Sequence, residues 1–206
     1  PIDRLYLTVD AYQIDIDDRI ALSSNITATP AAQALLQDLG LTQVTAFTYF
    51  TNGLDTRTRG VDAVASYTVP LAASSLELTG SYSYNETEVK TFTATPGVFN
   101  SLGITSSLIG RDEIGRIEDS YPKDKAILSA TWRAEHWDVG LAATRYGEFT
   151  VRNSATPARD QTYGAKWVLD ASASYKPSAN WTLTIGADNL LDEYPDRTAD
   201  LQNSTW

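Results

Sequence analysis

Few residues in this chain have side chains suited to catalysis or to metal binding. The sequence contains one histidine, His136, which stands beside Trp137, and it contains neither cysteine nor methionine. It has no Gly-x-Ser-x-Gly motif that would present a nucleophilic serine and no glycine-rich phosphate loop. We therefore expect no catalytic residue, no metal site and no cofactor, and we interpret His136 as a solvated or interfacial turn residue.

Three acidic residues, Asp15, Asp17 and Asp18, come closest to a metal-binding pattern. Their alternation is similar to that of a calcium loop, which holds its ion through carboxylate oxygens. The glycine and the distal glutamate that such a loop needs are missing. A strand that leaves a membrane and carries its acids into water explains the pattern better.

The remaining candidates would bind a ligand without changing it chemically. They are Phe47, Tyr49, Phe50, Arg111 and Arg116. The three aromatic rings could stack on a ligand or pack outer loops together, and the sequence favours neither interpretation. The two arginines stand among acidic residues in segment 93–122, where local ion pairs in a solvated loop are the simpler interpretation. Their functional alternatives are a ligand mouth or a divalent-ion contact with lipopolysaccharide.

The net charge argues against one class of partner. Lysine and arginine number 16 against 26 aspartates and glutamates, which gives a net charge of -10. Proteins that bind nucleic acid need a basic surface to neutralise phosphates. We therefore expect no nucleic-acid partner.

A two-residue rhythm of apolar and polar side chains dominates the chain. In segment 75–84, Leu76, Leu78, Gly80 and Tyr82 alternate with polar residues. Because successive side chains of a strand point to opposite faces, this rhythm predicts a strand with one apolar and one polar face. Six more segments share the rhythm: 4–20, 44–69, 126–132, 137–143, 167–175 and 181–187. The sequence thus predicts about seven strands of an antiparallel all-β fold.

Three local features depart from the rhythm. The apolar positions change phase between Ala11 and Ile14, which indicates a β-bulge or a departure from the membrane zone. Asn52-Gly53 predicts an interruption of segment 44–69. Segment 30–40 begins with proline and ends with glycine, which favours a short helix inside a loop.

The connections between strands alternate in length. Segments 70–74, 134–136 and 176–180 are tight turns, whereas 21–43, 93–122 and 151–164 are long. Short turns on one side and long loops on the other are typical of outer-membrane β-barrels. Five aromatic residues of the apolar phase lie close to the tight turns and are expected to form one interfacial girdle: Tyr67, Trp132, Trp137, Tyr175 and Trp181.

A soluble antiparallel sandwich would also show alternating strands. Its loops would have no reason to sort into a short side and a long side. Several apolar-phase positions are alanine or glycine, which would leave a sandwich core underpacked. The sequence therefore favours an antiparallel transmembrane β-barrel.

Three motifs resemble those of TonB-dependent outer-membrane receptors. Segment 9–20 resembles a late barrel strand of that family, 56–62 resembles its Arg-Gly-x-Glu strand, and 188–194 resembles the Asn-Leu-Phe-Asp signature of its penultimate strand. The residues at the matching positions are Arg59, Gly60, Asp62, Asn189, Leu190 and Asp192. Leu191 departs from the pattern, since phenylalanine is usual there.

The resemblance covers essentially the whole chain and implies a barrel of about 22 strands closed around an N-terminal plug. Residues 1–206 are then expected to be the C-terminal portion of that barrel, with the plug domain, the TonB box and the final strand outside them. The implied partners are the remaining barrel strands and plug, the TonB complex reached through the missing N-terminal part, lipid and lipopolysaccharide, and a small-molecule ligand.

The sequence therefore predicts a non-enzymatic receptor in the outer membrane of a Gram-negative bacterium. The resemblance implies TonB-energised uptake of a scarce nutrient, and ferric siderophores or similar chelates are the largest substrate class of the family. The alternatives are a passive porin-like barrel and a soluble all-β carbohydrate-binding module.

Overall fold

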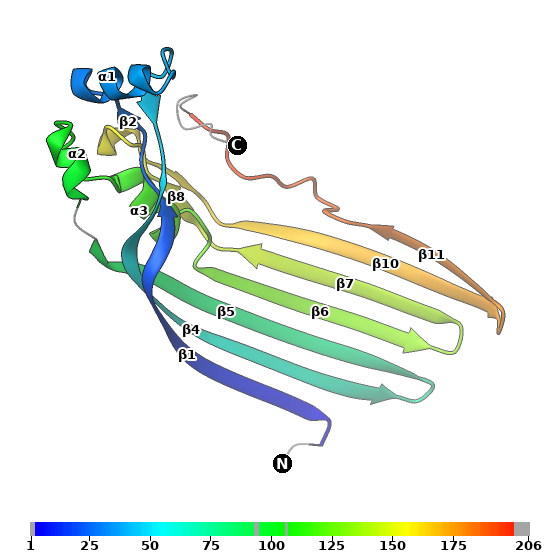
Figure 1. Cartoon of the computed structure of the whole chain (residues 1–206). Helices are drawn as coiled ribbons and strands as arrows, with labels where there is room; N and C mark the ends of the chain where they lie inside the picture. The colour runs from blue at the N-terminus through cyan, green and yellow to red at the C-terminus, as the bar shows by residue number, and fades with distance from the viewer. Residues whose placement is uncertain (1–2, 93–94, 106, 200–206) are drawn as a thin grey trace.

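The computed structural model describes residues 3–92, 95–105 and 107–199, and its main feature is one antiparallel sheet (Figure 1). The strands of this sheet, in spatial order, are β1 (Leu5–Leu22), β4 (Phe50–Leu71), β5 (Ser74–Phe92), β6 (Asp124–Ala134), β7 (Trp137–Tyr146), β10 (Lys166–Ser178) and β11 (Trp181–Ala187). Each strand of this sheet pairs with the next strand of the same sheet along the chain, so the sheet is an up-and-down meander. The expected seven antiparallel strands are confirmed. The final strand implied by the resemblance lies outside the described residues.

The register of the sheet collects the alternating residues into two faces. One row across six strands is entirely apolar or glycine: Leu7, Ala65, Gly80, Leu128, Ala143 and Leu169. The adjacent row, which points to the other side, is mostly polar: Tyr6, Ser66, Thr79, Ser129, Ala142 and Asp170. We call the first face the outer face and the second the inner face. A slip of one residue in any strand would exchange the two faces, so the pattern determines the register.

The two ends of the sheet differ in their connections. Residues 72–73, 135–136 and 179–180 are short turns at one end. The three long connections lie at the other end, where Figure 1 shows all the helices gathered. We call this second region the cap, which comprises the described parts of residues 23–49, 95–123 and 147–165.

The cap contains more secondary structure than the sequence predicted. Helix α1 (Pro30–Asp38) confirms the helix expected in segment 30–40, and the side chain of Thr29 accepts a hydrogen bond from the Ala32 N–H at 3.2 Å. Segment 93–122 was expected to be a long polar loop. The structure shows that it also contains two helices. The additional cap elements are α2 (Gly97–Ser101), α3 (Arg111–Glu118), η1 (Pro157–Arg159), and the strand pairs β2 (Ile26–Thr27) with β3 (Ala46–Phe47) and β8 (Phe149–Val151) with β9 (Gln161–Tyr163).

Two details of the strands also differ from expectation. Strand β4 runs through Asn52-Gly53, so the strand itself is not interrupted there, but its pairing with β1 shifts at this point and skips Gly53. Pairing between β1 and β4 is unbroken from Leu5 to Ile16, so no β-bulge accompanies the change of apolar phase after Ala11. The strand instead keeps its register there, and the first irregularity comes between Ile16 and Arg19.

Buried apolar side chains are confined to the cap end of the described chain. They are Ile26, Ala28, Ala32, Leu54, Ile104, Leu108, Ile109 and Tyr163. Five of these residues form a small core, with Phe47, Tyr49 and Phe99 packed against it. None of the described helices is both long and apolar enough to cross a membrane.

Candidate ligand-binding mouth

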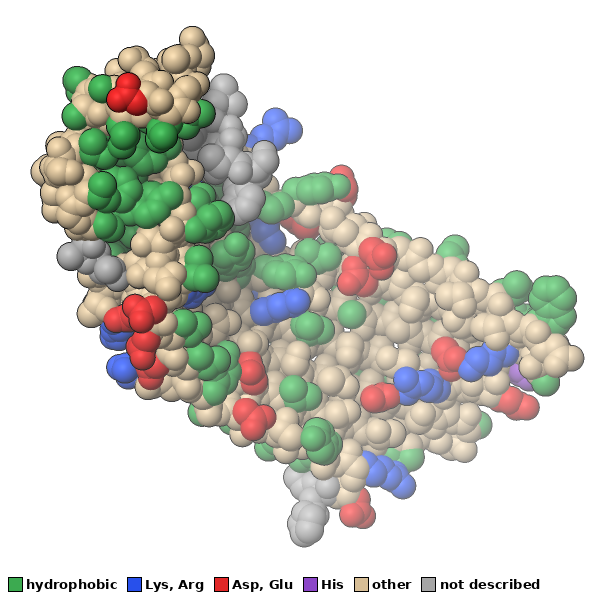
Figure 2. All heavy atoms as spheres, in the orientation of Figure 1, with side chains coloured by type: hydrophobic (Ala, Val, Ile, Leu, Met, Phe, Trp, Pro, Cys, Tyr) green, Lys and Arg blue, Asp and Glu red, His purple; other side chains and the backbone are tan. Residues whose placement is uncertain are grey.

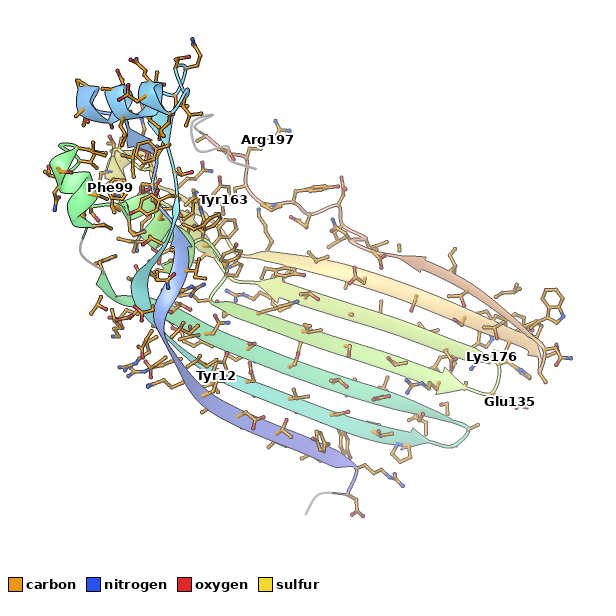
Figure 3. The ribbon with its side chains drawn as sticks, in the orientation of Figure 1. Tyr12, Phe99, Glu135, Tyr163, Lys176 and Arg197 are labelled. Carbon is orange, nitrogen blue, oxygen red and sulfur yellow. The ribbon has the colours of Figure 1, made fainter. Side chains whose placement is uncertain are left out.

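The three aromatic candidates, Phe47, Tyr49 and Phe50, differ in their packing. The ring of Phe99 in α2 stacks with Phe47 and Tyr49 at centroid distances of 6.3 and 5.0 Å. Figure 3 shows Phe99 among the side chains of the cap, far from Lys176 and Glu135 at the short turns. Phe50 is 75% exposed. Phe47 and Tyr49 therefore join two long connections, while Phe50 presents its ring to the surroundings.

Arg111 at the start of α3 forms a bidentate ion pair with Asp160. Its two terminal nitrogens each donate to one oxygen of that carboxylate at 2.7 Å, and one of them also donates to the carbonyl of Asn153. The guanidinium lowers the pKa of the Asp160 carboxyl to about 2, and the pKa of Arg111 is raised in return. The pair clamps α3 to the connection between β8 and β9.

Arg116 lies five residues further along α3 and stays accessible. It pairs with Glu113 at 3.1 Å, and its side chain is 47% exposed. Burial raises the pKa of the Glu113 carboxyl, which Arg116 partly offsets. Arg111 and Arg116 therefore differ in role, since the first is a structural clamp and the second reaches open space.

The open space beside Arg116 is a pocket of about 420 Å³ between α3 and the sheet. Its lining residues are Arg19, Asn85, Thr87, Arg116, Ile117, Glu118, Tyr121 and Lys123. We call it the mouth pocket, because it lies at the cap end of the sheet. Of the predicted ligand-binding residues, only Arg116 lines it.

The structure places the predicted girdle residues together at the short-turn end. Tyr67, Trp132, Trp137, Tyr175 and Trp181 all lie on strands close to a short turn, and all are at least 36% exposed. The rings of Trp137 and Tyr175 are in contact at a centroid distance of 4.6 Å. The arrangement suits an interface between an apolar and an aqueous phase, in which the ring is apolar and the polar atom is wet.

The inner face near the same turns carries ion pairs between neighbouring strands. Glu77 pairs with Arg133 at 2.5 Å, and Asp138 pairs with Lys176. Figure 2 shows the corresponding row of alternating red and blue side chains crossing a mostly polar face. Nδ1 of His136 lies 3.0 Å from the carbonyl of Lys176. Among the described residues no cluster of histidine and acidic side chains could hold a metal ion.

The family-motif residues of β4 connect adjacent strands. Arg59 donates to the side chain of Gln13 at 2.9 Å, and Asp62 accepts from Ser83 at 2.6 Å. A Cβ atom at Gly60 would lie 2.3 Å from the ring of Tyr12, so only glycine leaves room for that ring. Figure 3 shows Tyr12 on β1.

The second motif builds a turn directly after β11. Asn189 and Asp192 have positive φ angles of 51° and 55°, which these residue types tolerate better than most. The side chain of Asn189 exchanges two hydrogen bonds with the backbone of Glu193, each at 3.0 Å. Leu190 is 52% exposed, and its N–H donates to the carbonyl of Leu169 at 2.7 Å. These residues determine chain direction and do not line the mouth pocket.

Sequence reasoning missed Arg19, Tyr121 and Lys123 as neighbours of Arg116. Arg19 is far from the others in sequence, and simple alternation assigns it to the outer face. Lys123 follows Pro122 at the end of a long connection and carried no pattern that singled it out.

Comparisons with known proteins agree with the barrel-like sheet described above. A family described as "TonB dependent receptor-like, beta-barrel" matches residues 1–190. The solved structures with a similar fold include a chain titled "Copper transporter OprC", which is 18% identical and aligns with a TM-score of 0.56. The alignment covers 93% of this chain and 24% of that one, so this chain spans about a quarter of that protein. No match was found among curated proteins.

Proposed function

This chain belongs to the TonB-dependent receptor β-barrel family, and from this premise we propose that it forms part of the wall and mouth of a receptor that takes up a scarce nutrient. The family places it in the outer membrane of a Gram-negative bacterium. The observation that carries the proposal is the division of one seven-stranded meander into an apolar outer face and a polar inner face. Such a sheet suits a wall between lipid and a wet lumen.

The unequal ends of the sheet suggest which side meets the ligand. Outer-membrane barrels have short turns on the periplasmic side and longer loops outside the cell. The cap would then face the medium, and the mouth pocket would stand at the entrance of the lumen. The aromatic group near the short turns would mark the periplasmic interface. The remaining barrel strands, a plug and the TonB complex would complete the working receptor.

We propose a ferric siderophore or a similar chelate as the substrate. The mouth pocket offers amide, hydroxyl, carboxylate, ammonium and guanidinium groups, which hydrogen-bond to an organic chelator. The proposed transport needs no covalent chemistry from the chain.

Copper is the second candidate, because the similar solved structure is titled a copper transporter. Copper ions favour imidazole, thiolate and thioether ligands. This sequence has neither cysteine nor methionine, and its single histidine lies in a short turn at the end opposite the cap. Selective ligands for a bare copper ion would therefore have to come from other parts of the receptor, which favours a metal that arrives inside its chelator.

The decisive experiment is uptake of radioactive iron by cells that produce the full-length receptor as their single route for chelates. We expect uptake of a ferric chelate that stops when a protonophore or deletion of TonB removes the energy supply. A passive porin-like barrel would continue to admit the chelate under both treatments. A parallel series with radioactive copper distinguishes the two candidate metals.

A further inference from the structure

Strand β1 contains a β-bulge that redirects one side chain. Ile16 pairs with Thr56 and Arg19 pairs with Leu54, so β1 has one residue more than β4 over this interval. At the bulge Asp18 adopts a left-handed φ of 52°, and its N–H donates to the carboxylate of Asp55 at 2.9 Å. Aspartate tolerates a left-handed conformation better than most residues, and the hydrogen bond to Asp55 supports the bulge further.

The bulge changes the face on which Arg19 lies. Continuous alternation would put position 19 on the same side as Asp15, whose partner Arg57 extends the outer face of β4. With one extra residue, Arg19 instead lies opposite Leu54 and next to Thr56, on the inner side. Its guanidinium reaches Thr56 Oγ1 at 3.4 Å and lines the mouth pocket.

Arg19 also differs from the other charged groups of the pocket in its partners. Lys123 pairs with Glu86 at 2.8 Å and Glu118 pairs with Arg152 at 3.2 Å. Arg116 pairs with Glu113. Within the described part of the chain, Arg19 has no carboxylate at ion-pair distance and only the long hydrogen bond to Thr56. Most of its guanidinium donors therefore stay available to a ligand.

We infer that the mouth pocket is a subsite for a carboxylate group of the transported chelate, with Arg19 as the main donor. The inference rests on the proposed uptake function and adds to it the chemical class of ligand. A planar guanidinium matches a carboxylate with two parallel hydrogen bonds. Arg116 and Lys123 also line the pocket and add positive charge, and the 64% exposed Tyr121 adds an aromatic ring to the lining.

The test uses the full-length receptor in detergent and calorimetric titration with citrate, both metal-free and as its ferric complex. An uncharged ferric trihydroxamate serves as the second probe. Arg19→Gln keeps a polar side chain but loses the charge, and we expect it to weaken binding of both forms of citrate by about tenfold or more. Arg19→Lys should recover part of the affinity, because it restores a positive charge without the planar fork.

Lys90→Gln is the matched control, because it removes one positive charge from the cap end of β5 outside the pocket. It should change citrate affinity less than about twofold. The uncharged trihydroxamate should bind equally to the wild type and to Arg19→Gln. Added salt should weaken citrate binding to the wild type.

Two results would overturn the subsite. One is the absence of citrate binding to the folded wild-type receptor, and the other is an equal effect of Arg19→Gln and Lys90→Gln. Both can occur while energised chelate uptake continues, so the failure of this inference is distinguishable from failure of the proposed function. Unfolding midpoints of the variants show whether a loss of affinity comes from misfolding.

Discussion

The wall and the cap of this chain treat their apolar side chains in opposite ways. The wall, which is the seven-stranded sheet, leaves large apolar residues exposed along its outer face, such as Leu128 at 55% and Ile185 at 76%. The cap contains a small buried core, in which Ala32 and Ile104 are 2% and 4% exposed. The same apolar residue types therefore have two roles. On the outer face they are suited to contact with lipid, and in the cap core they pack together and exclude water.

The ion pairs of the two regions join different kinds of elements. In the wall, ion pairs bridge adjacent strands on both faces, such as Glu77 with Arg133 on the inner face and Asp15 with Arg57 on the outer face. In the cap, Arg111 joins helix α3 to the connection between β8 and β9 through Asp160. The cap thus has a small buried core of its own beside the sheet, and each region should respond to its own kind of damage.

The largest effect is expected from a cavity in the cap core. Ile104→Ala should destabilise the cap by about 2–5 kcal/mol, since the buried side chain loses its packing. Faster amide exchange in α1 and faster proteolysis of the cap would measure this change. The wall should keep its folded migration in unheated gels. Val98→Ala, at a 60% exposed position of α2, is the control, and concerted loss of wall and cap would contradict their independence.

A charge on the outer face should damage the wall instead. Leu128→Arg in β6 should destabilise the receptor by about 2–4 kcal/mol in phospholipid vesicles, because the guanidinium would enter the lipid near its midplane. Denaturant unfolding in vesicles measures the loss. Ser129→Arg is the control on the inner face, where the charge meets water. Equal losses for the two variants would mean that the outer face does not meet lipid.

An intermediate effect is expected from the clamp of α3. Asp160→Asn removes the carboxylate that Arg111 grips and should weaken docking of the β8–β9 hairpin by roughly 1–3 kcal/mol. Limited proteolysis within residues 147–165 is the measurement. Asp38→Asn, at an exposed position at the end of α1, should leave the cleavage rate unchanged. The same rate for both variants would assign the docking to other contacts.

The clamp also predicts a pH dependence of the cap. The folded pKa of Asp160 is about 2, below the ordinary value of 3.8, so the pair contributes fully above pH 3.8. That contribution is lost as the pH falls toward about 2. Cap proteolysis by an acid protease should therefore accelerate over this window in the wild type and less in Asp160→Asn.

The smallest effect is expected from the aromatic group at the short turns. Trp137→Leu should cost about 0.5–1.5 kcal/mol in vesicles, because it removes the ring contact with Tyr175 but leaves an apolar side chain. Denaturant unfolding measures the cost. Tyr194→Leu, an exposed aromatic position after β11, should cost less than about 0.5 kcal/mol. A cost for Trp137→Leu no larger than this control would argue against an interfacial role for the girdle.

Some elements of the cap could have been predicted and others could not. Helix α1 was predictable from its proline start and glycine end. Helix α3 carries Asp112 and Glu113 in its first turn and Arg116 in its last, and this charge order could have identified it. The short pairs β2–β3 and β8–β9 are only two or three residues per strand, too short to show a period.

The sequence by itself determined the strands, their faces and the unequal ends of the sheet. These properties are local, because alternation and turn length are properties of neighbouring residues. The tertiary structure decided which charged groups meet. Arg111 and Asp160 are 49 residues apart, and Arg19 reaches the mouth pocket only because β1 gains one residue against β4. A distant ion pair produces no periodic pattern in the sequence, so the pairing of Arg111 with Asp160 could not be inferred from it. A single extra residue in β1 exchanges the faces of the residues after it, so the position of Arg19 could not be inferred before the strands were paired.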